Sequence, residues 1–331
     1  MNRTIVRLPL LALVLPLALA GAGPRAARAA GTAVVALTTT TDLADVVRRV
    51  GGDAVTVESL CKGPEDPHFL DARPTFLQAM RRAELVVVTG MGLEDGYLPL
   101  LLREAGNPGV RPGGAGYVDA SARIRKLGVP TGPVTRAMGD VHAAGNPHYL
   151  LDPANAGIVA EDVAKALSAL RPDGAAGFAE RAAALRRELS DLLLGAPSGP
   201  DGKGPRAGGY LERFRPHRGA GVVGYHANLE YLCERLGLTL VGSLEPKPGV
   251  PPTAAHVASL AERARGGAVR VVARNVFQPE GPVASFAAQT GAQAVLIAHQ
   301  PGATADAPDL LSMHRRNLDA LLRALEATTA R

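Results

Sequence analysis

The chain has 331 residues, and its 36 Lys and Arg against 31 Asp and Glu give a formal net charge of +5. Its first 29 residues contain four arginines and no acidic residue, so the remainder carries 32 basic and 31 acidic side chains. This near balance gives no electrostatic basis for nucleic-acid binding. Roughly 300 residues exceed a single ordinary core, and two domains are therefore expected.

Residues 1–29 are typical of a secretory signal peptide. Two arginines precede an apolar run over Leu8–Ala20, which is too short to anchor the chain in a bilayer. Small-residue cleavage motifs at 18–20 and 27–29 favour removal before about Ala30. No cysteine follows the run and no later segment is long and apolar, so the sequence predicts a soluble periplasmic protein without a lipid anchor.

The two cysteines allow two interpretations. Cys61 and Cys233 lie in different halves of the chain, and a disulfide between them would clamp the halves together. Alternatively, both are buried, unpaired thiols.

From Ala33 onward, β-branched apolar runs alternate with helical patterns. Asp42–Val50 has its apolar residues at helical spacing, with Asp42 as the predicted N-cap and glycines at its end. In this half, strands are predicted at 33–40, 54–60, 83–89 and 116–118, and helices at 42–50 and 74–82. Such alternation indicates a parallel sheet, whose ligand-binding groups gather at the carboxyl ends of the strands.

The middle of the chain is strongly helical. Asp152-Pro153 predicts an N-cap and first helical position, followed by helices over Pro153–Leu170 and Ala175–Leu194. The second, about 30 Å long, is the expected connector between two lobes. Residues 196–209 are rich in Gly, Pro and Ser and indicate a loop.

A second alternating unit follows, with strands predicted at 219–225, 238–241, 269–273 and 294–298 and helices at 228–236, 253–265, 281–290 and 308–326. The predicted class is therefore α/β, with two lobes that each contain a mostly parallel sheet flanked by helices. We expect an N-terminal lobe at 30–173, a linking helix at 174–195 and a C-terminal lobe at 196–331.

Four of the eight histidines fall at strand ends or in ordered loops, namely His68, His148, His226 and His299. His148 lies between the turn dipeptide Asn146-Pro147 and the helix start at Asp152. Neutral imidazoles suit divalent metals, and three of them with one further donor suit tetrahedral Zn²⁺, although scattered turn histidines would give the same long-range spacing.

The other histidines are weaker candidates. His142 could capture metal or orient a neighbour, but an exposed loop residue is favoured. His217 lies beside two arginines, which discourages metal binding. His256 and His314 fall within predicted helices and are interpreted as surface or packing residues.

Four segments carry a resemblance to a known family: E-D-P-H-F-L-D-A-R-P-T (65–75), G-D-V-H-A-A-G-N-P-H-Y-L-L-D-P (139–153), G-Y-H-A-N-L-E-Y-L-C-E-R-L-G-L (224–238) and E-P-K-P-G-V-P-P-T-A-A-H (245–256). From about Ala33 to its end, the chain resembles the zinc/manganese-type (cluster A-I) substrate-binding proteins of bacterial metal ABC importers. The resemblance implies two α/β lobes joined by one long rigid helix, with the metal between them.

The resemblance also implies that His68, His148 and His226 are the first three ligands. Manganese-selective relatives typically have glutamate at the third position, so His226 favours Zn²⁺ over Mn²⁺. The fourth ligand departs from the family pattern, because V-L-I-A-H-Q-P-G (295–302) stands where relatives commonly have aspartate. His299 occupies or adjoins that position, with Gln300, Glu245, Glu65 or a water as alternatives.

The sequence thus predicts a non-enzymatic protein that captures Zn²⁺ and delivers it to an ABC permease, as a monomer. The alternative is a zinc hydrolase with three histidine ligands and a metal-bound water, for which Glu65 or Glu245 would be the base. No compact H-E-x-x-H motif supports that alternative. An adhesin is a third interpretation, which the sequence alone does not test.

Overall fold

The computed structural model describes Met1 and residues 33–135, 138–199 and 202–329. Apart from Met1, the predicted signal peptide lies outside the described residues. Ala33–Arg331 forms one compact unit. Among the described residues, we find no helix that combines the length and apolarity needed to cross a membrane.

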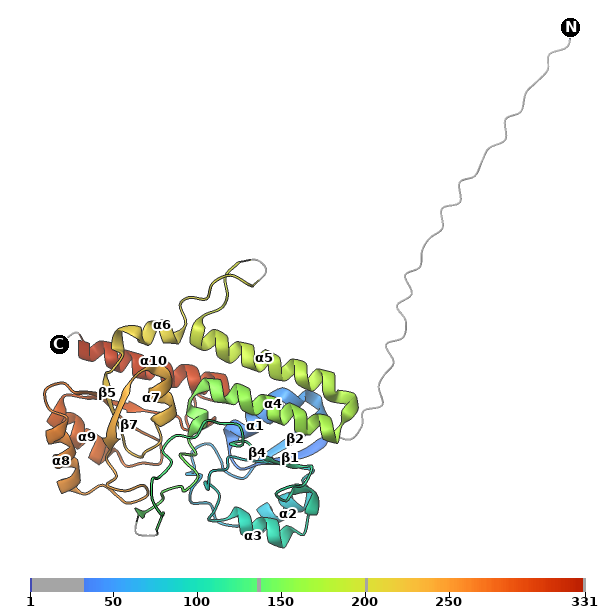
Figure 1. Ribbon diagram of the computed structural model, residues 1–331, viewed down its shortest axis with the longest axis horizontal. Helices are drawn as coiled ribbons and strands as arrows, with labels where there is room; N and C mark the ends of the chain where they lie inside the picture. Colours follow the sequence, from blue (N-terminus) through green and yellow to red (C-terminus); the bar gives the residue numbers. More distant parts are fainter. Residues whose placement is uncertain (2–32, 136–137, 200–201, 330–331) are drawn as a thin grey trace. The chain divides into compact units, whose positions relative to one another are not determined.

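The first sheet consists of four parallel strands in the order β2-β1-β3-β4. Its two faces pack against different helices, because successive residues of β1 and β3 point to opposite sides. α1 and α4 (Pro153–Leu170) cover one face, and α2 and α3 cover the other (Figure 1). The bounds are β1 (Val34–Thr38), β2 (Val55–Ser59), β3 (Leu85–Val88), β4 (Tyr117–Asp119), α1 (Thr41–Gly51), α2 (Pro74–Arg82) and α3 (Leu98–Ala105).

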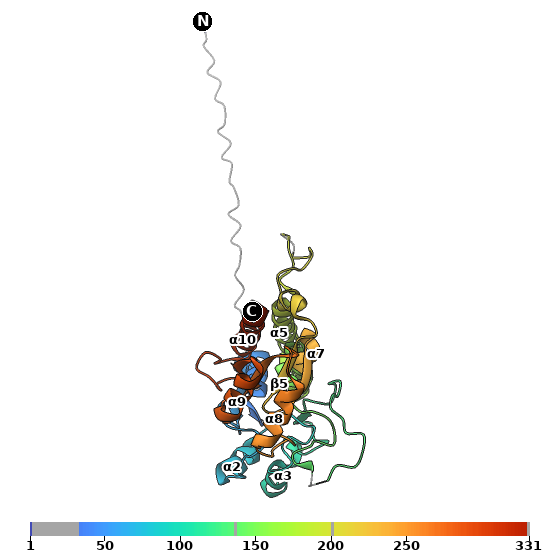
Figure 2. The ribbon, with the colours of Figure 1, turned by 90° about the vertical axis from the view of Figure 1, so that its left-hand side faces the viewer.

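The second sheet repeats this arrangement in the order β6-β5-β7-β8, again fully parallel. α6, α7 and α10 contribute to the core on one face, and α8 and α9 to the core on the other. Figure 2 shows α8 and α9 on the side of this sheet away from α10. The bounds are β5 (Gly221–Gly224), β6 (Thr239–Ser243), β7 (Val269–Arg274), β8 (Gln293–Leu296), α6 (Tyr210–Phe214), α7 (Glu230–Leu236), α8 (Ala254–Arg263), α9 (Glu280–Thr290) and α10 (Leu310–Thr329).

Two long helices connect the sheets. α4 (Pro153–Leu170) begins as predicted, with the Asp152 side chain accepting a hydrogen bond from the Ala154 amide and Pro153 at the first helical position. α5 (Ala175–Leu194) packs along α4 and then leads to α6 (Figure 1). The predicted α/β class, with two lobes and a long helix, is confirmed. We call β1–β4, with the segments that connect them and the chain through α4, the first lobe. We call the elements from α6 to α10 the second lobe.

Contacts cross from one lobe to the other near the last helix. The Leu310 amide at the start of α10 donates to Asp45 Oδ2 in α1 at 3.1 Å, and Leu310 and Met313 belong to the core beneath α1. α10 therefore anchors the second lobe to the first, which the sequence pattern did not indicate.

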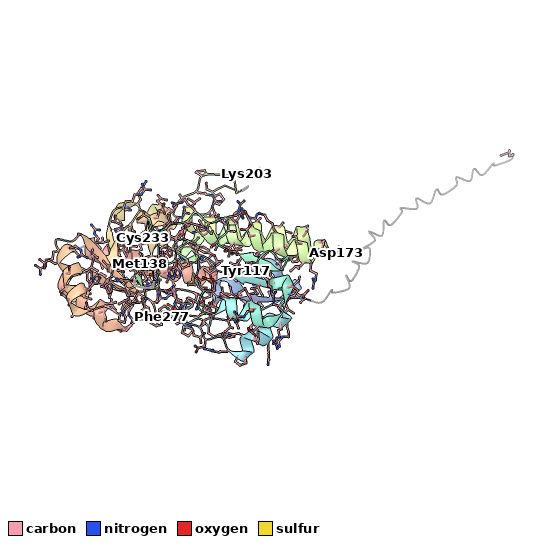
Figure 3. The ribbon with its side chains drawn as sticks, turned by 60° about the horizontal axis from the view of Figure 1, so that its bottom comes forward. Tyr117, Met138, Asp173, Lys203, Cys233 and Phe277 are labelled. Atoms are coloured by element: carbon pink, nitrogen blue, oxygen red, sulfur yellow. The ribbon has the colours of Figure 1, made fainter. Side chains whose placement is uncertain are left out.

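The structure corrects the predicted N-cap of α1 and decides between the two interpretations of the cysteines. The N-cap of α1 is Thr40 rather than Asp42, because Thr39 and Thr40 leave the sheet and the helix starts at Thr41. Cys61 and Cys233 are both buried and unpaired, and Cys233 lies on α7 of the second lobe (Figure 3).

Short 3-10 turns occur at Gly52–Ala54, Pro108–Val110, Tyr149–Leu151, Pro172–Gly174 and Arg215–His217.

Candidate metal centre

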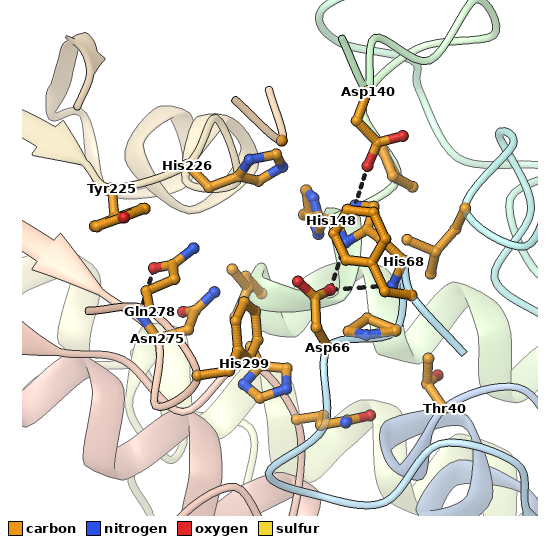
Figure 4. A pocket seen from close by; sticks show the side chains of 18 of the residues that line it. Thr40, Asp66, His68, Asp140, His148, Tyr225, His226, Asn275, Gln278 and His299 are labelled. Atoms are coloured by element: carbon orange, nitrogen blue, oxygen red, sulfur yellow. Dashed lines mark hydrogen bonds and ion pairs between the residues drawn. The ribbon is translucent and has the colours of Figure 1, made fainter. Parts of the chain in front are cut away.

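Three predicted histidines meet where the two lobes face each other. His68 follows β2, His226 follows β5, and His148 precedes the 3-10 turn that leads into α4. Their ligand atoms all lie within 4.8 Å of one another, and their ring centroids are 5.0–5.3 Å apart. Figure 4 shows the three rings pointing into a common space. This group spans both lobes and has the donor set expected for Zn²⁺.

A carboxylate orients one histidine from each lobe. Asp66 Oδ1 lies 2.8 Å from His68 Nδ1, and Glu245 Oε2 lies 2.7 Å from His226 Nδ1. Each carboxylate holds a proton on Nδ1 and so leaves Nε2 with a free lone pair for a metal. Glu245 was predicted only as an alternative fourth ligand, and Asp66 was not predicted, although its spacing of two residues from His68 was a usable signal.

The loop that carries His148 is tied to the loop that carries His226. The His148 amide donates to Asn146 Oδ1 at 3.0 Å, and Asn146 Nδ2 donates to the Ala227 carbonyl at 2.6 Å. The Nε2 atoms of His68 and His148 are buried without a hydrogen-bond partner among the described residues. Buried, unpartnered imidazole nitrogens are costly unless a ligand satisfies them.

Protonation is not equally favourable for His68 and His148. Burial lowers the pKa of His68, but the hydrogen bond to Asp66 and the charges of Asp66, Asp140 and Glu245 together raise it above its ordinary value. Burial, with the neighbouring imidazoles, holds the pKa of His148 well below its ordinary value. His148 is therefore neutral, which is the state required of a metal ligand.

His299 lies outside the three-histidine group, although it lines the same cavity of about 260 Å³. Its Nε2 is 2.9 Å from the Glu65 carbonyl, its ring meets Phe277 edge to face, and its Nδ1 is buried without a partner among the described residues. Burial lowers the pKa of His299 to about 4. The structure thus keeps His299 neutral but does not join it to the other three.

The alternatives for the fourth ligand already have partners. Gln300 Nε2 donates to Cys61 Sγ and to the Lys62 carbonyl, and its Oε1 accepts from the Thr41 amide. Glu65 Oε2 accepts from the Lys62 amide at 2.8 Å. Glu245 is bound to His226. Gln300 therefore ties the loop ahead of His68 to the second lobe.

A second group shares His68 and was not predicted. Asp140, His142 and His68 have ligand atoms within 4.8 Å of one another. His142 is half-buried rather than exposed, because it stacks on His68 with ring centroids 5.5 Å apart. Of the remaining histidines, His217 and His314 are buried, and half-buried His256 contacts the Ser243 carbonyl.

Comparison with known proteins agrees with this architecture. The family model described as "Zinc-uptake complex component A periplasmic" matches residues 36–194 and 209–324. The high-affinity zinc uptake system protein ZnuA of Brucella abortus is 26% identical over 172 residues, covering 52% of this chain and 47% of that protein. The iron-binding protein YfeA of Yersinia pestis is 25% identical over 169 residues, covering 49% and 50%. The chain spans about half the length of the curated relatives it matches.

Solved structures show the same fold. A Cd-bound periplasmic metal binding protein from Candidatus Liberibacter asiaticus aligns with a TM-score of 0.70 at 20% identity, covering 88% of this chain and 99% of that one. A crystal structure of ZnuA aligns with a TM-score of 0.68 at 21% identity and the same coverage. Since the family model matches most of the chain, this protein belongs to the family of periplasmic zinc-uptake complex A components.

Proposed function

We propose that this protein binds Zn²⁺ in the periplasm and delivers it to the membrane permease of an ABC importer. The observation that carries the proposal is the convergence of His68, His148 and His226 from two lobes, with ligand atoms within 4.8 Å of one another. Two of these rings are oriented by carboxylates, as metal-ligating histidines usually are. Family membership supports the same function.

Zinc is the favoured ion because the three donors are imidazole nitrogens. Mn²⁺ prefers oxygen donors, so a site built from three histidines favours Zn²⁺ over Mn²⁺. Metal analysis of protein purified without added metal, followed by competition between the two ions, tests this choice. We expect Zn²⁺ to displace Mn²⁺ at equal concentration, and preferential retention of Mn²⁺ would contradict it.

His299 is the predicted fourth donor. Its buried Nδ1 and its place in the cavity lining support that role, but coordination requires its ring to turn or to release the Glu65 carbonyl. A bound water would be the fourth donor if His299 kept its contact with the Glu65 carbonyl.

The hydrolase alternative lacks support. Of the two bases predicted for it, Glu245 holds His226 Nδ1, and Glu65 Oε2 accepts a hydrogen bond from the Lys62 amide. A catalytic base must instead be available to a metal-bound water. The family is described as part of a zinc-uptake complex, which favours transport.

We further propose that residues 1–29 direct export and are removed, leaving a soluble monomer without a lipid anchor. The arginines followed by an apolar run support the export step. The absence of a cysteine after that run supports a free, unanchored protein.

The decisive test is His148→Ala. We expect it to lose most zinc affinity in calorimetry, because it removes a buried neutral donor without disturbing either sheet. His256→Ala is the matched control, since His256 is half-buried on α8 and outside the group. Unchanged affinity in His148→Ala would overturn the proposed function.

A further inference from the structure

One buried side chain of the second lobe holds two separate segments of the first lobe. Gln300 follows β8 and is 1% exposed. Its Oε1 accepts from the Thr41 amide at 3.1 Å, and its Nε2 donates to the Lys62 carbonyl at 2.9 Å. We propose that Gln300 is a positioning residue for zinc, which sets where His68 of the first lobe meets His226 of the second. This inference rests on the proposed function, because it concerns the affinity of the same three-histidine group.

The contacts of Gln300 require a primary amide. On one side the group must accept, because the Thr41 amide lies in the first turn of α1, where amides have no partner within the helix. On the other side it must donate, because Nε2 faces the carbonyls of Lys62, Gly63 and Glu65 at 2.9–3.3 Å. A carboxylate could not donate and would place negative charge against buried carbonyl oxygens. The side-chain chemistry of Gln300 is therefore that of a link between the lobes.

The segment that Gln300 holds leads directly to His68. We call residues 61–66 the β2 turn, because they follow the end of β2. The Glu65 carbonyl in this turn accepts from Gln300 Nε2 at 3.3 Å. Asp66 comes next in the chain, and its carboxylate orients the His68 ring. A shift of the β2 turn at Glu65 would therefore move Asp66 and His68 together.

The backbones of the two lobes lie in close contact beside Gln300. Gly63 of the β2 turn is buried, and a Cβ added to it would lie 2.2 Å from the carbonyl carbon of Gly302. Close-packed backbone atoms leave no space for such a group. The glycine thus lets the β2 turn approach the second lobe as far as the Gln300 amide reaches. This contact depends on residues of both lobes, so a change in either lobe should displace the turn.

The position of His68 matters because the three donors come from two lobes. The loop of His148 is tied to that of His226 by Asn146, whose Nδ2 donates at 2.6 Å to the carbonyl that follows His226. Gln300 provides the corresponding link for the loop of His68. Groups that support metal ligands typically change metal affinity by about 10–100-fold. Because Gln300 acts through the β2 turn and does not touch a ligand, we expect an effect at the low end of this range.

The test measures zinc affinity by competition with a chelating dye for the full chain and for Gln300→Met, which keeps the length of the side chain without its amide. We expect affinity to fall about tenfold. Gly63→Ala is the second variant, because it displaces the β2 turn while every hydrogen-bonding side chain stays in place. Unfolding midpoints of the metal-free proteins check that each variant is folded. Unchanged affinity in either folded variant would overturn the positioning role.

Thr41→Val is the matched control. It removes the 2.7 Å hydrogen bond from Thr41 Oγ1 to the Pro301 carbonyl, which also joins the lobes, but it keeps the backbone amide that Gln300 contacts. We expect a lower unfolding midpoint with unaltered zinc affinity. A loss of affinity equal to that of Gln300→Met would mean that any weakened contact between the lobes has this effect, and the inference would fail.

Co²⁺ provides a second measurement, because its visible absorption spectrum depends on the geometry of its ligands. A displaced His68 should change the spectrum of bound Co²⁺ in Gln300→Met and Gly63→Ala, whereas Thr41→Val should keep the spectrum of the unaltered chain. Weaker binding by Gln300→Met with an unaltered spectrum would trace the loss to the stability of the fold and would also overturn the inference.

The two proposals fail in different ways. If His148→Ala keeps tight binding, the proposed function is wrong. If His148→Ala loses affinity while folded Gln300→Met and Gly63→Ala keep the affinity of the unaltered chain, only the positioning role is wrong.

Discussion

The two lobes share one strand order, but they place different side chains at corresponding strand ends. After β2 the first lobe presents His68, whereas after β6 the second lobe presents Glu245. After β1 the first lobe has threonines, whereas after β5 the second lobe has His226. Glu245 then holds His226, while in the first lobe Asp66 from the same loop holds His68.

This difference shows how a duplicated architecture produces an asymmetric site. Parallel sheets bring their carboxyl ends to one edge in both lobes, so the fold supplies equivalent positions. In the first lobe one loop after β2 carries both His68 and its orienting carboxylate, whereas in the second lobe His226 follows β5 and its carboxylate follows β6. The first lobe supplies two histidines of the three-histidine group, His68 and His148, and the second lobe supplies His226.

The largest expected effect comes from removing the second lobe's contribution. His226→Ala should weaken zinc binding by more than about 100-fold, beyond the range typical of residues that only orient a ligand. Competition with a chelating dye measures the affinity, with His256→Ala as the control. Retained tight binding would mean that the first lobe binds the ion alone.

The orienting carboxylates should have the next largest effect. We expect Asp66→Asn and Glu245→Gln each to weaken zinc binding by about 10–100-fold, because each loses the charge that fixes a ring and its tautomer. Similar losses would show that the lobes contribute equally. Glu58→Gln, at the exposed end of β2, is the charge-matched control, and a loss no greater than its own would contradict the orienting role.

His299→Ala tests the fourth ligand. We expect a loss of about tenfold, at the low end for groups around a metal, because His299 must turn its ring or release the Glu65 carbonyl to contribute. A loss as large as that of His226→Ala would make His299 a full ligand, and no loss would leave the position to water. Calorimetry on both variants provides the comparison.

A separate effect concerns the free energy of unfolding rather than zinc affinity. Burial lowers the pKa of His314 to about 3 in the folded protein from 6.5. The unfolded chain therefore binds the proton first, and stability present above pH 6.5 is lost as the pH falls towards 3. His314→Leu should flatten this slope and stabilise the protein by about 2 kcal/mol at pH 5.

Urea unfolding between pH 7 and 4 with a chelator present measures this slope without a contribution from bound metal. His256→Leu is the control for loss of a helical histidine. An unaltered slope in His314→Leu would show that His314 is not protonated on unfolding in this range.

Much of the fold was readable from local patterns. α4 and α5 match their predicted bounds because Asp152-Pro153 starts one, and the 171–174 segment separates the two. Strand ends were less accurate, as at Thr39 and Thr40, because the run of β-branched residues continues past Thr38, where the strand ends. The anchoring of α10 on α1 depends on contacts between distant segments, which periodicity does not encode.

Local sequence patterns established which histidines stand at strand ends and in ordered loops, because turn residues and strand boundaries are local properties. Tertiary packing then brings three of them together while His299 faces Glu65. It also decided that Asp66 and Glu245 orient rings, and that Asp140 and His142 approach His68. Ligand geometry depends on how two lobes are packed together, and no single segment of the chain contains that information.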